Sequence, residues 1–95
     1  MTDSRYLWPW TSMTPAERRD FARRVKADRL AFEAAGLLAK CEPDRAAPLA
    51  RDAIALVGPE RLGFWLRHYA RSKFKVAAAI AEEFLASVTA VRKAA

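Results

Sequence analysis

Side chains able to bind a charged ligand gather between residues 61 and 75. This stretch holds five basic residues, one histidine and no acid. If it is helical, a rotation of about 100° per residue places most of these charges on one side, with a phenylalanine among them. Such a face attracts phosphates or carboxylates. We therefore predict that a nucleic acid or another partner contacts Arg61, Phe64, Arg67, His68, Arg71, Lys73 and Lys75.

Enzymatic chemistry is not expected of this sequence. Catalysis by a nucleophile or a general base needs several side chains brought together, and His68 is the only histidine. Neighbouring Glu82 and Glu83 diverge by about 100° on a helix, which makes them a poor carboxylate pair. Cys41 is the only cysteine, which excludes an internal disulfide and any Cys/His metal spacing. We predict no catalytic residue, no metal site and no cofactor.

The composition predicts one globular domain with a basic surface. The chain has 95 residues, of which 53% are hydrophobic and 29% charged, as is typical of a folded protein. Its net charge of +6 favours nucleic acid or acidic protein surfaces as partners. No apolar run approaches the roughly 20 residues that cross a bilayer, and the N-terminus does not resemble an export signal. Together with the single cysteine, these features predict a cytoplasmic protein without membrane contact.

Two helices are predicted ahead of the basic stretch. Thr14 to Glu17 has the pattern of a capping box, so a first helix should begin there and run through Gly36 to about Lys40. Its first half should bury the large side chains Phe21, Val25 and Phe32, and residues 30–39 should be enclosed on most sides. A second helix, capped by Asp44, should continue to Val57.

Two further helices should carry the basic stretch and follow it. Gly58 and Pro59 predict a tight turn into a third helix that ends near Ser72. Its apolar stripe, which should face the core, is Leu62, Trp65, Leu66 and Tyr69. Gly63 inside this helix indicates close approach of a neighbouring helix. A fourth helix should span Phe74 to about Val91, with an apolar stripe formed by Ile80, Phe84, Val88 and Val91.

These elements predict an all-α fold, a compact bundle of about four helices within a single domain over residues 14–95. Residues 1–13 should form an extended aromatic arm, because Pro9 disfavours a helix in the residue before it. Exposed rings in the arm would be costly, so the arm should pack on its own domain or insert into a partner. The arm residues that could bind such a partner are Tyr6, Trp8 and Trp10.

Two functions are compatible with this outline. Residues 47–72 resemble a helix-turn-helix unit in outline, which implies nucleic-acid contact through the helix from Pro59 to Arg71. Ile54 stands where that motif commonly has alanine, and Arg67 where it is ordinarily apolar. The alternative is a protein-binding inhibitor, adaptor or small subunit of a larger assembly, because aromatic side chains and arginine dominate interface energies. Charge alone does not separate DNA, RNA and an acidic protein surface, and the oligomeric state stays open.

Overall fold

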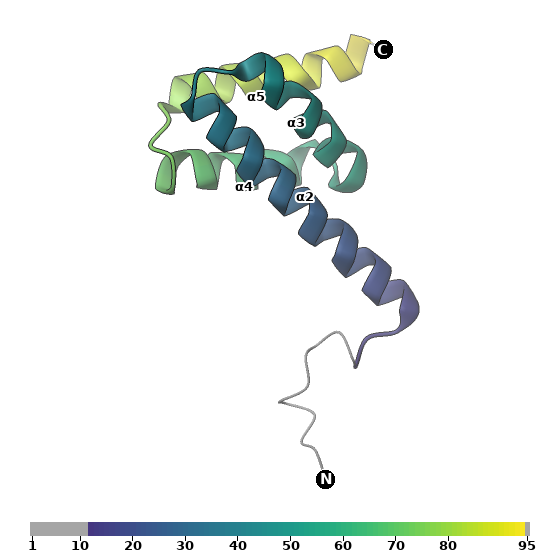
Figure 1. The fold of residues 1–95 in the computed structure, drawn as a ribbon. Coiled ribbons are helices and arrows are strands. Elements are labelled where there is room, and N and C mark those ends of the chain that lie inside the picture. The colour runs from purple at the N-terminus through teal and green to yellow at the C-terminus, as the bar shows by residue number, and fades with distance from the viewer. Residues whose placement is uncertain (1–11, 95) are drawn as a thin grey trace.

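Four helices account for most of the chain. The computed structural model describes residues 12–94, and the side chains of residues 12–90. From Thr14 to Ala94 the chain contains no strand, and its helices are α2 (Pro15–Ala39), α3 (Pro43–Val57), α4 (Pro59–Ser72) and α5 (Ala78–Ala94) (Figure 1). The prediction of an all-α bundle of four helices is confirmed. The predicted arm, with Tyr6, Trp8 and Trp10, lies outside the described residues.

The predicted capping box at the start of α2 is confirmed. Thr14 N donates to Glu17 Oε1 at 2.8 Å, and Glu17 N donates to Thr14 Oγ1 at 3.2 Å. Hydrogen bonds to the Glu17 carboxylate from the backbone N–H of Thr14 and, to a smaller extent, from its side chain lower the pKa of Glu17, because they stabilise the ionised form. Pro15 occupies the first helical position, where its missing N–H costs no hydrogen bond.

At its other end, α2 passes through Gly36 unbroken and closes in a Schellman-type turn. Cys41 has a positive φ of 60°, the position that glycine usually fills in this turn. Glu42 N donates to Leu37 O at 2.9 Å, and Cys41 N donates to Leu38 O at 3.0 Å. These bonds satisfy carbonyls that the helix end would otherwise leave free.

The prediction that Asp44 caps α3 is wrong by two residues. Glu42 stands at the N-cap without a side-chain cap hydrogen bond, and Pro43 begins the helix. The left-handed turn at Cys41 reverses the chain so tightly that Pro43, whose φ is already helical, can begin the next helix at once. Asp44 falls in the first turn, where the helix dipole favours its charge.

The fourth helix begins at Ala78, not at Phe74 as predicted, whereas the predicted end of α4 at Ser72 is confirmed. Lys75 has a positive φ of 58°, which interrupts the helical path. Val76 N donates to Ala70 O at 2.7 Å, so the connection wraps back over the end of α4. The Phe74 ring meanwhile packs over Gly36, where an added Cβ would lie 3.3 Å from Cζ of the ring.

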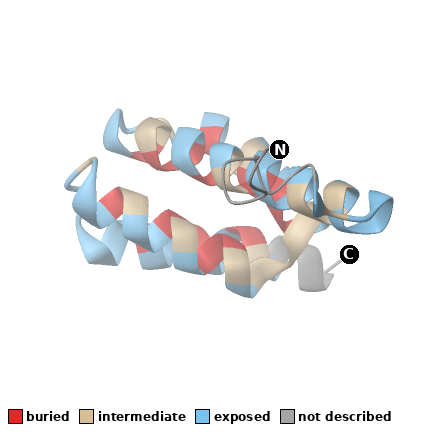
Figure 2. Cartoon of the chain, turned by 90° about the horizontal axis from the view of Figure 1, so that it is seen from below, coloured by how far each residue is buried: buried red, intermediate tan, exposed pale blue. Residues whose placement is uncertain are grey.

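Alanine dominates the core. The buried residues lie mainly on helix sides that face one another (Figure 2). Small side chains allow helix axes to approach closely, and α2 packs most extensively against α3. Leu62, Leu66 and Ala70 supply the buried side of α4, flanked by half-buried Trp65 and Tyr69. On α2 and α3 the buried residues are Ala27, Ala31, Ala34, Ala35, Leu38, Ala46, Ala50, Ala53 and Ile54.

The predicted buried face of the first half of α2 is wrong. Val25 is 44% exposed, Phe32 is 37% exposed and Phe21 is half-buried. At 100° per residue these side chains point roughly 100° to 140° away from the buried line through Ala27 and Ala31. The prediction assumed that the largest apolar side chains would be buried, whereas the buried positions of this helix are mostly alanine. The first half of α2 also extends beyond the other helices (Figure 1).

The predicted apolar stripe of α5 is partly correct. Phe84 and Val88 are buried as expected, together with Ala81 and Leu85. Ile80 is 50% exposed, so its placement in the stripe is wrong. The side chain of Val91 lies outside the described residues. Across residues 12–94, none of the helices combines the length and apolar character needed to cross a bilayer.

Candidate nucleic-acid interface

A shallow groove of about 820 Å³ runs along the outer side of α4 and onto the connection that follows it. It brings together five of the seven binding residues predicted from the sequence, and Glu60 and Ser72 complete its lining. We call it the α4 groove. The five predicted residues in it are Phe64, Arg67, His68, Arg71 and Lys75.

Helical spacing explains why four of these side chains meet. Phe64, Arg67, His68 and Arg71 are separated by three or four residues, which puts neighbouring Cβ atoms about 5–6 Å apart on a helix surface. Lys75 joins them although it follows the helix. Its positive φ of 58° departs from the helical path, and its side chain still lines the groove.

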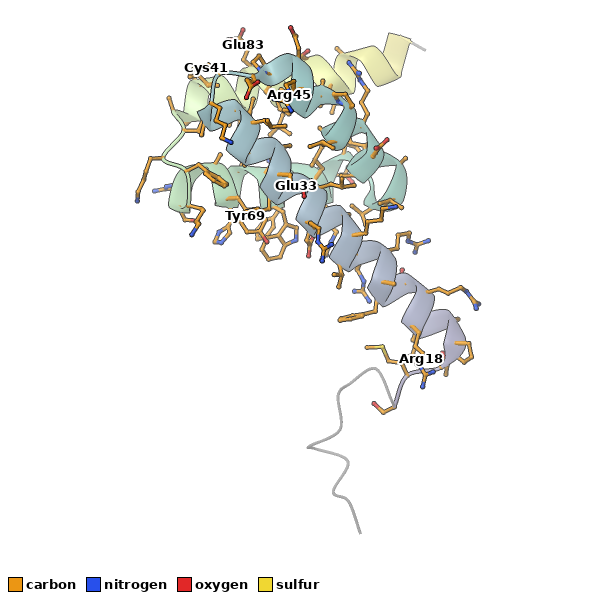
Figure 3. All side chains as sticks on the ribbon, in the orientation of Figure 1. Arg18, Glu33, Cys41, Arg45, Tyr69 and Glu83 are labelled. Carbon is orange, nitrogen blue, oxygen red and sulfur yellow. The ribbon has the colours of Figure 1, made fainter. Side chains whose placement is uncertain are left out.

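Aromatic rings border the cations of the groove. Phe64 is 62% exposed, and its ring meets that of Trp65 at 5.2 Å between centroids and 89° between planes. His68 also meets Trp65 almost perpendicularly, at 5.6 Å. Trp65 itself stacks on Tyr69, which projects from α4 in Figure 3. Half-buried Trp65, stacked on Tyr69, therefore holds the exposed rings of Phe64 and His68 against the bundle.

Among the groove residues, Arg67 is the one that forms an ion pair with another residue of the described part of the chain, residues 12–90. Its Nη2 donates to Glu82 Oε1 at 3.0 Å, and its Nε donates to Glu82 Oε2 at 2.5 Å. The hydrogen bond raises the pKa of Arg67 and lowers the pKa of Glu82, because each charge stabilises the other. The pair joins α4 to α5, and both side chains stay half exposed, at 53% each.

Arg71 and Lys75 are exposed, and neither makes an ion pair with another described residue. They are therefore the groove cations most available to an external anion. Lys73 is exposed but does not line the groove. Arg61 is half-buried and turned toward α2, where its Nη2 lies 3.7 Å from Asp28 Oδ2. The structure thus separates Lys73 and Arg61 from the other predicted residues.

Gly63 lies against the side chain of Arg67. An added Cβ would lie 3.1 Å from Nη1 of Arg67, so the close neighbour is a side chain of α4 itself. The side chain of this arginine, one turn later in α4, lies back over Gly63 and pairs with Glu82 of α5. Glycine leaves room for that path.

No known protein family, curated protein or solved structure matches this chain. What it binds is therefore inferred from the groove itself. Within residues 12–94, no three His, Cys, Asp or Glu side chains gather as a metal site.

Sequence reasoning missed two groove partners. Glu60 lines the groove near the start of α4, and Glu82 pairs with Arg67 across 15 residues of chain. A cluster on one helix follows from spacing, but a pair between two helices depends on how they pack. The sequence contains no local signal for Glu82 as the partner of Arg67.

Proposed function

We propose that this chain is a small nucleic-acid-binding protein that contacts phosphates through the α4 groove. The observation that carries the proposal is that two exposed, unpaired cations, Arg71 and Lys75, share one groove with the exposed rings of Phe64 and His68. Arginine and lysine bind phosphate oxygens, and rings beside them can touch sugars or bases.

The charges of the groove are unevenly distributed along α4. Glu60 lies at its N-terminal end, while Arg71 and Lys75 lie at its C-terminal end, and Arg67 between them is paired with Glu82. Phosphates are therefore attracted mainly to the second half of the groove. Arg71 and Lys75 are the residues expected to bind them.

This distribution favours contact along the groove over insertion of α4 as a helix-turn-helix recognition helix. Such a helix contacts base edges with its N-terminal residues, where this chain has Glu60 and an Arg61 turned toward Asp28. The connection between α3 and α4 is Gly58 alone, whereas the turn of the motif usually spans three or four residues.

Replacing both Arg71 and Lys75 by alanine should weaken binding to a labelled oligonucleotide. Loss of two phosphate contacts should also reduce the slope of log affinity against log salt by about one to two units. Fluorescence anisotropy between about 50 and 200 mM salt measures both quantities. The matched control is the Lys40→Ala, Arg51→Ala variant, which removes the same charge from exposed positions outside the groove.

Three outcomes would overturn the proposal. The first is no binding of the wild-type chain to oligonucleotides at low salt. The second is an equal loss of affinity in the control variant, which would mean that net charge rather than the groove is responsible. The third is binding to poly-glutamate but not to oligonucleotides, which would favour an acidic protein surface as the partner.

A further inference from the structure

Phe64 is the most exposed of the large hydrophobic side chains for which burial is described, at 62%. Its neighbour Trp65 meets it with ring planes 89° apart, so this contact covers at most one face of the Phe64 ring. Because Trp65 holds the exposed Phe64 ring in place, another flat ring can stack on the free face of Phe64. This arrangement offers stacking without much further loss of side-chain freedom.

The cations beside Phe64 extend this surface in one direction. Arg67 and His68 follow Phe64 by three and four residues, and Arg71 follows His68 by three, so each lies one turn of helix from the next. Lys75 closes the far end of the groove. A chain of phosphates that passed over Arg71 and Lys75 would therefore have its bases within reach of His68 and Phe64.

The two forms of nucleic acid differ in whether their bases can reach that ring. In a duplex the flat faces of the bases are hidden in the stack, and a ring on a helix surface touches only edges and backbone. In a single strand every base can expose a face, and aromatic side chains beside a basic track are the usual means of binding it. Because Glu60 occupies the end of α4 that would enter a duplex groove, the observations favour the single strand.

We infer that the α4 groove binds single-stranded nucleic acid, with a base stacked on Phe64 and phosphates on Arg71 and Lys75. This inference rests on the nucleic-acid function proposed above and specifies the form of nucleic acid. Stacking is tolerant of sequence, so the groove selects unpaired bases with little regard to which base is present.

The test compares three labelled probes by fluorescence anisotropy: an oligothymidine, a duplex of the same length, and polyphosphate, which has no bases. The wild-type chain should bind the oligothymidine more tightly than the duplex. Phe64→Ala should weaken binding to oligothymidine by about 5- to 100-fold, the range for loss of one stacked base. It should weaken binding to the duplex much less, and it should leave binding to polyphosphate, which has no bases, unchanged.

Phe64→Leu is the matched control for apolar area. Leucine keeps a large apolar side chain but has no flat ring, so this variant should lose nearly as much affinity for oligothymidine as Phe64→Ala. Circular dichroism establishes that both variants stay folded, as expected for a side chain outside the core.

The outcomes separate this inference from the function on which it rests. Equal affinity for duplex and oligothymidine, or equal loss of polyphosphate binding in Phe64→Ala, would overturn the stacking inference and leave the nucleic-acid function standing. Failure of the wild-type chain to bind either oligonucleotide would overturn both.

Discussion

The guanidinium of Arg67 sits among the groove residues, but Glu82 holds it. A carboxylate so placed competes with any incoming phosphate, because both accept hydrogen bonds from the same Nε and Nη2 atoms. At the scale of single residues, a carboxylate on α5 therefore determines whether Arg67 is free to bind an anion in the groove. That carboxylate belongs to Glu82.

Glu82→Gln should strengthen binding to an oligonucleotide by a few-fold. The change releases Arg67, removes a nearby negative charge, and should increase the salt slope by about 0.7 to 0.9, the contribution of one phosphate contact. Fluorescence anisotropy at several salt concentrations measures the change. Glu83→Gln is the control, since Glu83 is an exposed acid on the same helix that projects elsewhere (Figure 3). Equal gains in the two variants would contradict a specific role for Glu82.

The same pair predicts a dependence of stability on pH. Because Arg67 lowers the pKa of Glu82 below its ordinary value, the pair stabilises the fold when the carboxyl is ionised, above the ordinary carboxyl range. That contribution should be lost as pH falls through the lowered pKa. Urea unfolding of the wild type and of Glu82→Gln should therefore differ at neutral pH and converge in acid. A difference that persists in strong acid would contradict the assignment.

At the scale of elements, Gly58 decides how α3 and α4 meet. Its φ of 90° and ψ of 163° lie in a region open essentially only to glycine. No neighbour lies within 4 Å of the position that a Cβ would take. A side chain at position 58 is therefore disfavoured by the backbone conformation and not by a clash with neighbouring atoms. This conformation sets the direction in which α4, and with it the groove, leaves the turn.

Gly58→Ala should destabilise the protein by about 1–3 kcal/mol through backbone strain alone. For a chain of this size, each kcal/mol lowers Tm by about 4–8 °C. Gly63→Ala is the matched control. There alanine improves helix propensity by up to about 1 kcal/mol, and the guanidinium end of Arg67 needs to shift only slightly. Thermal unfolding followed by circular dichroism should show a larger loss of Tm for Gly58→Ala than for Gly63→Ala, and a stable Gly58→Ala variant would contradict the conformational argument.

At the scale of the whole molecule, the packing is uneven along α2. Its first buried side chain is Ala27, although the helix begins at Pro15. Ahead of that point the helix projects from the bundle (Figure 1) and carries its own ion pairs, in which Arg23 and Arg24 both contact Asp20. Exposed pairs of this kind stabilise a helix by only a few tenths of a kcal/mol each.

Hydrogen exchange should reveal this difference. The amides of residues 19–26 should exchange faster than those of residues 31–38, because local opening of the projecting part exposes no core side chain. Exchange measured by mass spectrometry on peptides from the two parts provides the comparison within one molecule. Equal protection in both parts would mean that the projecting half is held by contacts beyond those described.

Local chemistry determined much of this fold. The capping box at Thr14, the Gly58–Pro59 turn and the end of α4 near Ser72 depend on residues adjacent in sequence, so they could be predicted and are confirmed. The alignment of Phe64, Arg67, His68 and Arg71 along one side of α4 also follows from helical periodicity. The sequence could therefore predict most of the residues that line the groove, although it could not predict the shape of the groove or the ion pair of Arg67.

Tertiary structure decided what depends on how closely the helices approach. The buried positions of α2 are mostly alanines, while Phe32 meets Tyr69 and Phe74 outside the core, because helices in close contact have little room for large side chains between them. The same packing selected Glu82 as the partner of Arg67 and turned Arg61 toward Asp28. Periodicity within one helix carries no information about distances to another, so only the folded chain could show which cations remain free.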